Sequence, residues 1–202
     1  MRVLLVVSGA SGLVVGLRLA EALSAAGAEL HTVVTPEALL VADYECMGRR
    51  GFVEALRRFS KNLYLSTELD APVASSSHPI DAGAAAPASM RLVASLAQGI
   101  HSDLASRALG SLLRSRKRVV LIFREAPLGP VELRNLYRLA EMGAVIVPAV
   151  IGLYSGAETL REAVDFVVGK ALDALGIENK LYRRWSREAP PRDPCRAFYG
   201  QS

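Results

Sequence analysis

The most constraining feature of this sequence is its opening, where a short apolar run leads through glycines into a helix. Residues 3–7 form a continuous Val- and Leu-rich run, the pattern of a strand buried on both faces of a parallel sheet. Small residues follow at 8–12, and a helix is predicted from about Leu13 to Ala26, closed by Gly27. A chain that begins this way is expected to build an α/β fold.

A second strand and helix follow directly. Residues 30–34 are again apolar, and Thr35-Pro36-Glu37 has the order of an N-cap, a proline in the first turn and an early acid. This β-α-β-α order predicts a right-handed crossover and a doubly wound parallel sheet. The stretch 62–87 is predicted as loop with one short strand. The remaining elements predicted are strands at 82–86, 119–123 and 144–147, two helices within 89–116 that meet near Gly99, and helices at 131–141 and 158–175.

Size and composition favour one domain in a homo-oligomer. The chain has 202 residues, of which 51% are hydrophobic, enough for one substantial core. Its mean hydropathy of +0.26 is high, so part of the apolar surface is expected to lie between subunits. The net charge of +4 is small and local, which favours solvated helix ends over nucleic-acid binding.

The cysteines and the apolar runs bear on location. Cys46 and Cys195 form neither a disulfide framework nor a CxxC site, which favours a cytoplasmic protein. The apolar start is interrupted by glycines and followed by charges, unlike a secretory signal. No run approaches the roughly 20 apolar residues that span a bilayer, so no membrane association is expected.

The glycine turn at 8–12 lies where open parallel sheets bind ligands, beyond the carboxyl end of a strand. The turn alone is a weak signal, because strand-to-helix packing also needs small residues. It is not the GxGxxG fingerprint, and the second strand ends in Thr35 instead of the acid that would hold an adenosine ribose. The pattern therefore disfavours NAD and favours a mononucleotide.

Arg124 and Glu125 follow the strand at 119–123, so both side chains are expected at the same sheet edge as the glycine turn. One alternative is a surface ion pair that contributes little. Ala126-Pro127 favours a defined site, because proline restricts the chain as it leaves the strand.

Several motifs, taken in order, resemble the flavin prenyltransferase (UbiX) family over nearly the whole chain. They are the Gly-Ala-Ser-Gly turn, Pro87-Ala88-Ser89-Met90, Arg107-Ala108, Arg124-Glu125-Ala126-Pro127-Leu128, the segment 143–148, Tyr154 and the helix containing Asp165-Phe166-Val167-Val168. The resemblance implies a single flavodoxin-like, Rossmann-like domain at 1–185 and a dodecameric assembly. Residues 186–202 are expected to be a disordered or inter-subunit tail.

The resemblance also implies the chemistry and the site. Family members join a dimethylallyl group from a prenyl monophosphate to N5 and C6 of reduced FMN, and a UbiD-type decarboxylase uses the product. The residues implied to contact FMN are Gly9, Ala10, Ser11, Thr35, Ser89, Met90, Arg91 and Arg124. Tyr154 and Lys170 would hold the prenyl phosphate with Ser11 and Arg114, and Glu125 would handle the proton. No metal is expected, because His31, His78 and His101 lack ligand spacing.

Some of these residues also have structural interpretations. Tyr154 could cover a strand end, and Lys170 could belong to the polar face of the last helix. Arg107 and Arg114 are seven residues apart and share a helix face, which could be a site wall or a solvated stripe. Trp185 could serve packing or an interface.

The sequence departs from the family pattern in five places. Ala88 stands for a usual Cys, Leu92 for a Thr, Ser76 for a Gly, Glu132 for a His and Arg114 for a Lys. Loss of a hydroxyl at Leu92 removes at most one or two flavin hydrogen bonds, each worth about 1 kcal/mol. The departures bear on FMN affinity more than on the fold.

Two other functions remain open at this stage. One is an FMN-dependent cysteine decarboxylase of the same broad fold, although no His lies in residues 1–30 to match its catalytic His. The other is a non-enzymatic flavin carrier, or a basic nucleic-acid-binding oligomer whose binding would depend steeply on salt.

Overall fold

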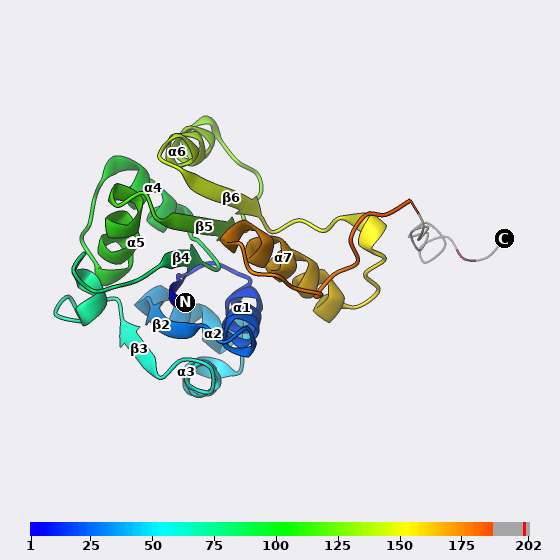
Figure 1. The fold of residues 1–202 in the computed structure, drawn as a ribbon, viewed down its shortest axis with the longest axis horizontal. Coiled ribbons are helices and arrows are strands. Elements are labelled where there is room, and N and C mark those ends of the chain that lie inside the picture. The colour runs from blue at the N-terminus through cyan, green and yellow to red at the C-terminus, as the bar shows by residue number, and fades with distance from the viewer. Residues whose placement is uncertain (188–199, 201–202) are drawn as a thin grey trace.

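The fold is a six-stranded parallel sheet covered by helices on both faces (Figure 1). A computed structural model describes residues 1–187 and residue 200. The strands are β1 (Arg2–Val7), β2 (Glu29–Val34), β3 (Asn62–Leu65), β4 (Ala82–Ala85), β5 (Arg118–Phe123) and β6 (Ala144–Pro148). The helices are α1 (Leu13–Ala25), α2 (Pro36–Glu45), α3 (Gly48–Arg57), α4 (Met90–Gln98), α5 (Leu104–Arg114), α6 (Pro130–Glu141) and α7 (Leu160–Leu175), with single turns η1 (Pro72–Ala74) and η2 (Leu153–Ser155).

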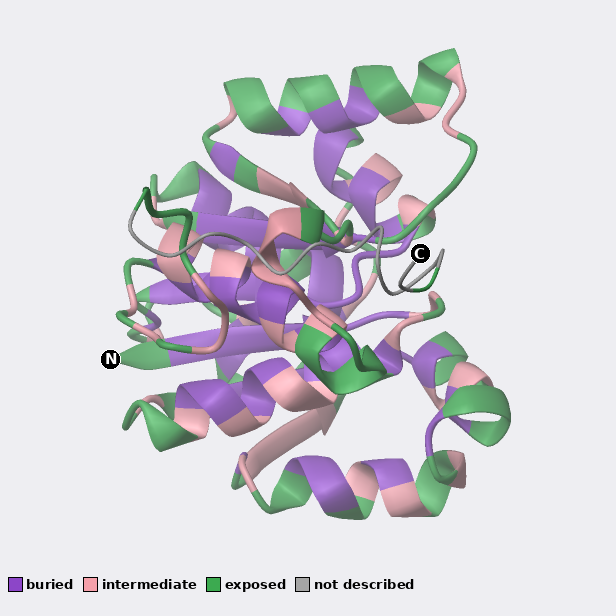
Figure 2. Cartoon of the chain, turned by 90° about the vertical axis from the view of Figure 1, so that its right-hand side faces the viewer, coloured by how far each residue is buried: buried purple, intermediate pink, exposed green. Residues whose placement is uncertain are grey.

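Alternate side chains of the central strand β1 enter two separate cores. Val3, Leu5 and Val7 pack under α1, α2, α3 and α7, whereas Leu4 and Val6 pack under α4, α5 and α6. Figure 2 shows the strands as a buried layer between helices whose outer faces are exposed. Successive side chains of a strand point to opposite faces of the sheet, and both faces of β1 are buried. The first apolar run therefore shows no alternation of apolar and polar residues.

The strand order is β3-β2-β1-β4-β5-β6, so the direction of winding reverses between β1 and β4. The chain leaves β1 for α1 on one face and leaves β4 for α4 on the other. Such a reversal opens a crevice at the carboxyl ends of the two strands, where ligands of open α/β sheets bind. The predicted single flavodoxin-like α/β fold with a doubly wound parallel sheet is confirmed.

The loop predicted for 62–87 is wrong at its start. Residues 62–65 form β3, which pairs in parallel with β2 at the edge of the sheet. Its sequence Asn-Leu-Tyr-Leu gives only four residues of intermediate or exposed character, too few to show a strand pattern. The short strand predicted at 82–86 is present as β4.

Part of the C-terminal tail falls outside the described residues. The tail predicted for 186–202 includes 188–199 and 201–202, which lie outside them, so its disorder or inter-subunit role stays a prediction. Within the described part of the chain, no helix has both the length and the apolar character needed to cross a membrane.

Candidate functional site

The turn after β1 packs tightly against the start of α2. A Cβ at Gly9 would lie 2.3 Å from the Cβ of Glu37, so only glycine permits this approach. Gly12 has φ of +102°, in the left-handed region that favours glycine. These two glycines are therefore required by the shape of the turn that opens α1.

Ser8 joins the carboxyl ends of β1 and β4. Its Oγ donates a hydrogen bond to the Pro87 carbonyl at 2.8 Å and accepts one from the Ser89 backbone nitrogen at 2.8 Å. Ser8 is fully buried, so these bonds fix the spacing of the two strands at the crevice. The sequence analysis placed Ser8 in the turn without assigning it this role.

Helices α1, α2 and α4 begin at this edge of the sheet, beside the crevice. Besides α1, Thr35 caps α2 by accepting a hydrogen bond from the Ala38 nitrogen at 3.2 Å, and Ser89 caps α4 by accepting from Leu92 at 3.3 Å. Helix N-termini present backbone N–H groups and positive dipole ends, which favour anions. These helix starts therefore fit a mononucleotide phosphate such as that of FMN.

Arg91, in the first turn of α4, is held between two carboxylates. Its Nη2 lies 3.3 Å from Glu37 Oε2 and 3.5 Å from Asp103 Oδ2. The pKa of Glu37 is lowered, chiefly by a hydrogen bond from its own backbone and further by Thr35 and Arg91, although burial opposes the shift. Arg91 thus lies beside the predicted flavin residues Thr35 and Ser89.

Glu45, which the sequence analysis missed, reaches the glycine turn from the end of α2. Its carboxylate accepts hydrogen bonds from the Gly12 nitrogen at 3.0 and 3.1 Å and from Ser11 Oγ at 3.3 Å. An acid in the last turn of a helix is opposed by the helix dipole. That unfavourable position was the signal in the sequence that Glu45 has another partner.

Arg124 and Glu125 follow β5 at the same edge, as predicted, and both are exposed. Glu125 Oε1 accepts a hydrogen bond from the Ala126 nitrogen at 3.1 Å. Within residues 1–187 the structure shows no ion pair between Arg124 and Glu125. The alternative in which the two only neutralise each other is therefore not supported.

Tyr154 and Lys170 come together beside α7, as predicted. The pKa of Lys170 is raised, chiefly by the Tyr182 hydroxyl and also by Tyr154, while burial opposes the rise. Tyr154 stacks edge-on against Phe166 at 5.9 Å and Trp185 at 5.4 Å between ring centroids. Packing therefore orients the Tyr154 ring, and its role toward a phosphate stays a prediction.

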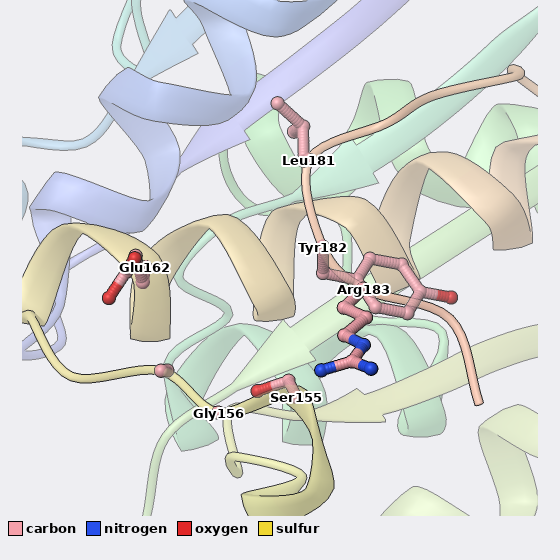
Figure 3. A pocket seen from close by; sticks show the side chains of 7 residues that line it. Ser155, Gly156, Glu162, Leu181, Tyr182 and Arg183 are labelled. Carbon is pink, nitrogen blue, oxygen red and sulfur yellow. The ribbon is translucent and has the colours of Figure 1, made fainter. Parts of the chain in front are cut away.

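A cavity of about 260 Å³ opens between η2 and the segment that follows α7 (Figure 3). Figure 3 shows Ser155, Tyr182 and Arg183 among the side chains around it. The residues lining it are Ser155, Gly156, Ala157, Glu162, Leu181, Tyr182 and Arg183. The cavity is therefore lined by Ser155, the residue that follows Tyr154, and by Tyr182.

Arg114 lies in a different place, a hollow of about 640 Å³ beside α5. Its Nη1 donates to His101 Nε2 at 2.9 Å, and Arg107 on the same face donates to the Ala74 carbonyl at 3.2 Å. The hollow is lined by Leu69, Asp70, Ala71, Pro72, Ala74, Ser75, Ser76, His101, Arg107 and Arg114. Within one chain, Arg114 therefore lies apart from Tyr154 and Lys170.

The structure shows what surrounds the residues that depart from the family pattern. Glu132 accepts a hydrogen bond from the Gly129 nitrogen at 3.0 Å and so caps α6. Ala88 and Leu92 are buried, and Ser76 lines the hollow with Arg114. Within the described residues, no group of three or more His, Cys, Asp or Glu side chains is arranged to hold a metal ion.

Comparison with known proteins identifies the family. Residues 1–172 match the Flavoprotein family. A flavin prenyltransferase UbiX from Saccharolobus solfataricus is 37% identical over 186 residues, 91% of this chain and 92% of the relative. One from Helicobacter pylori strain J99 is also 37% identical over 186 residues, covering 92% and 98%. The chain belongs to the UbiX flavin prenyltransferase family.

Solved structures agree with this membership of the UbiX family. A crystal structure of AnUbiX in complex with FMN and dimethylallyl pyrophosphate superposes with a TM-score of 0.87 at 30% identity, over 92% of this chain and 97% of that one. A dodecameric FMN-dependent UbiX-like decarboxylase from Escherichia coli O157:H7 gives 0.86 at 28%, over 92% and 100%. The FMN-dependent cysteine decarboxylase TvaF gives 0.60 at 24% and shares the fold alone.

Proposed function

We propose that this protein is a flavin prenyltransferase that joins a dimethylallyl group from a prenyl monophosphate to N5 and C6 of reduced FMN. The observation that carries the proposal is the meeting of Lys170 with Tyr154 in a chain of the UbiX family. A cation beside a phenol suits a phosphate ester, and the glycine-lined sheet edge suits a mononucleotide.

Binding of FMN is assigned to the sheet edge. The residues proposed for it are Gly9, Ala10, Ser11, Thr35, Ser89, Met90, Arg91 and Arg124. The turn and the capped helix starts would present backbone N–H groups, and the two arginines would add positive charge. When bound, reduced FMN supplies the electron-rich ring that accepts the prenyl group.

The leaving phosphate is assigned to cations and hydroxyl groups. Lys170, Arg114 and Tyr154 would donate to its oxygens as the allylic C–O bond breaks, so that charge-assisted hydrogen bonds stabilise the charge that develops. Ser11 would donate there when its hydroxyl turns away from Glu45. These donors compensate the negative charge of a monophosphate ester. We therefore propose no metal in the site.

Two carboxylates are proposed to handle protons. Glu125 would accept the proton that leaves C6 when the new C–C bond forms there. Glu45, which accepts a hydrogen bond from the Ser11 hydroxyl at 3.3 Å, would accept through Ser11 the proton that leaves N5 when the N5–C bond forms. Carboxylates at two points of one edge allow protons at different atoms to be moved separately.

The site is proposed to be shared between subunits of a homo-oligomer, because Arg114 lies apart from Lys170 within one chain. The size we propose for the oligomer is a dodecamer. The dodecameric UbiX-like relative supports this arrangement. Consumption of the product is assigned to a UbiD-type decarboxylase.

The test is direct. The protein is incubated without oxygen with reduced FMN and dimethylallyl monophosphate, and the extracted flavin is weighed by mass spectrometry. We expect a gain of one C5H8 unit and release of inorganic phosphate. Unchanged flavin with intact prenyl phosphate would disprove the proposal.

A further inference from the structure

The segment after α7 folds back along that helix and places Tyr182 between Lys170 and Asp173. Lys170 Nζ lies 4.8 Å from the centroid of the Tyr182 ring and 5.5 Å from that of Phe166. The Tyr182 hydroxyl donates a hydrogen bond to Asp173 Oδ2 at 2.5 Å. The ammonium group therefore lies against aromatic rings, with a phenolic oxygen beside it.

Asp173 is itself fixed by three side chains. Arg184 binds it with two nitrogens, Nη2 to Oδ1 at 2.7 Å and Nη1 to Oδ2 at 3.1 Å, and Asn179 Nδ2 donates to Oδ1 at 2.9 Å. Burial tends to raise the pKa of Asp173, but the bonds from Arg184 and Tyr182 outweigh it and lower the pKa. The carboxylate is thus charged and holds the Tyr182 hydroxyl in one orientation.

Gly169 lets the Tyr182 ring approach the backbone of α7. A Cβ at Gly169 would lie 2.4 Å from Cδ1 of Tyr182, so a larger residue would displace the ring. The ring is also stacked against Phe166 at 5.1 Å between centroids. Packing and hydrogen bonding therefore hold the Tyr182 side chain in one position.

We propose that Tyr182 is a positioning residue that aims the Lys170 ammonium at the prenyl phosphate. Its O–H donates to Asp173 and its oxygen accepts from Arg184 Nη1 at 3.2 Å, which leaves one lone pair of that oxygen for Lys170. A lysine is a point charge on a flexible stem, so a fixed acceptor and ring restrict where that charge lies. This inference rests on the proposed function, since it assumes that Lys170 receives the phosphate.

The test uses Tyr182→Phe, which keeps the ring and removes the hydroxyl. Binding of dimethylallyl monophosphate and of inorganic phosphate to the FMN-loaded protein is measured by calorimetry, together with KM and kcat. Loss of a hydrogen bond to a charged group predicts roughly tenfold weaker binding of both ligands and a matching rise in KM. FMN affinity is expected to stay unchanged. Tyr44→Phe, at a tyrosine that is 92% exposed, is the matched control.

A double-mutant cycle separates positioning from general damage. In a Lys170→Ala background, Tyr182→Phe should have no further effect on phosphate binding, because the residue acts through Lys170. An equal loss in both backgrounds, or no loss in the single variant, would overturn the inference. If the wild-type protein binds phosphate through Lys170 but leaves FMN unmodified, the proposed function fails while the positioning role stands.

The pH profile gives an independent measurement. Without the hydroxyl, the pKa of Lys170 should fall toward its ordinary value, so phosphate binding should weaken at a lower alkaline pH than in the wild type. The charged or titratable groups facing this pair are Tyr154, Asp173, Glu178 and Arg184. An identical alkaline limb in the two proteins would contradict the role of Tyr182.

Discussion

The carboxylate of Glu45 lies 3.0 Å from the backbone nitrogen of Gly12, so the end of α2 supplies an anion to the start of α1. The same carboxylate accepts a hydrogen bond from the Ser11 hydroxyl. Residues 33 apart in the chain thus meet at the glycine turn. The turn therefore contains a proton acceptor next to Ser11 as well as backbone donors.

Glu45→Gln should slow prenyl transfer while leaving FMN bound. The amide oxygen can still accept from Gly12, so the turn keeps its shape, but the side chain no longer takes a proton from Ser11. General-base contributions of about a hundredfold to ten-thousandfold set the scale of the expected loss. Rapid-quench measurement of flavin prenylation checks it, with Glu54→Gln, at an exposed position on α3, as control. Wild-type rate in Glu45→Gln would remove the proposed role.

FMN should bind in preference to FAD and NADH. Thr35 stands at the end of β2 and caps α2, so no carboxylate at this position receives an adenosine ribose. Uptake of each compound by the flavin-free protein is measured by fluorescence and gel filtration. Tight uptake of FAD or NADH without uptake of FMN would contradict the mononucleotide site.

How far the sequence predicts this site depends on the range of the interactions involved. The turn at 8–12 and the Arg124-Glu125 pair could be placed because each directly follows a strong apolar strand, and parallel strands end at one edge. Thr35 was recognisable as a helix cap from local order alone.

Contacts between distant segments could not be read in the same way. Glu45 meets Gly12, and Asp173 meets Arg184, through tertiary packing that no local pattern encodes. The sequence did not predict β3, because an edge strand of four residues has little apolar periodicity. Arg114 was correctly placed on a face with Arg107, but its distance from Lys170 in one chain became visible only in the fold.

Tyr154→Phe and Lys170→Ala should each weaken use of the prenyl phosphate and leave FMN binding nearly intact. Lys170 lies on α7 with Tyr154 beside it, whereas the proposed flavin contacts come from other segments, so each variant removes a phosphate donor without changing a flavin contact. Loss of a charge-assisted hydrogen bond predicts about tenfold or more in KM. Steady-state kinetics and FMN titration measure the two effects separately. Release of FMN by either variant would show that these roles are assigned wrongly.

Mixed oligomers should reveal a site made by more than one subunit. Lys170→Ala and Arg114→Ala are each expected to lose most activity, because each removes a cation from the phosphate. If the two cations come from different subunits, assembly of both variants together restores some sites with both cations. Activity of the mixed oligomer above that of either variant checks this. No recovery, in a preparation shown by light scattering to be mixed, would count against shared sites.

Glu125→Gln gives the most specific test of the chemistry. Bond formation at C6 requires that a proton leave this atom, and Glu125 is an exposed carboxylate beside Arg124 at the end of β5. Glutamine keeps the shape and can still accept from the Ala126 nitrogen, so the loop should stay in place. It cannot accept the proton, which predicts normal FMN binding with formation of the ring-closed product slowed by about a hundredfold to ten-thousandfold. Absorbance spectra of the flavin over time, together with its mass, follow the reaction. Because no ion pair joins Arg124 and Glu125 in the described chain, loss of charge alone should not disturb Arg124. Ring closure at the wild-type rate would therefore show that Glu125 transfers no proton.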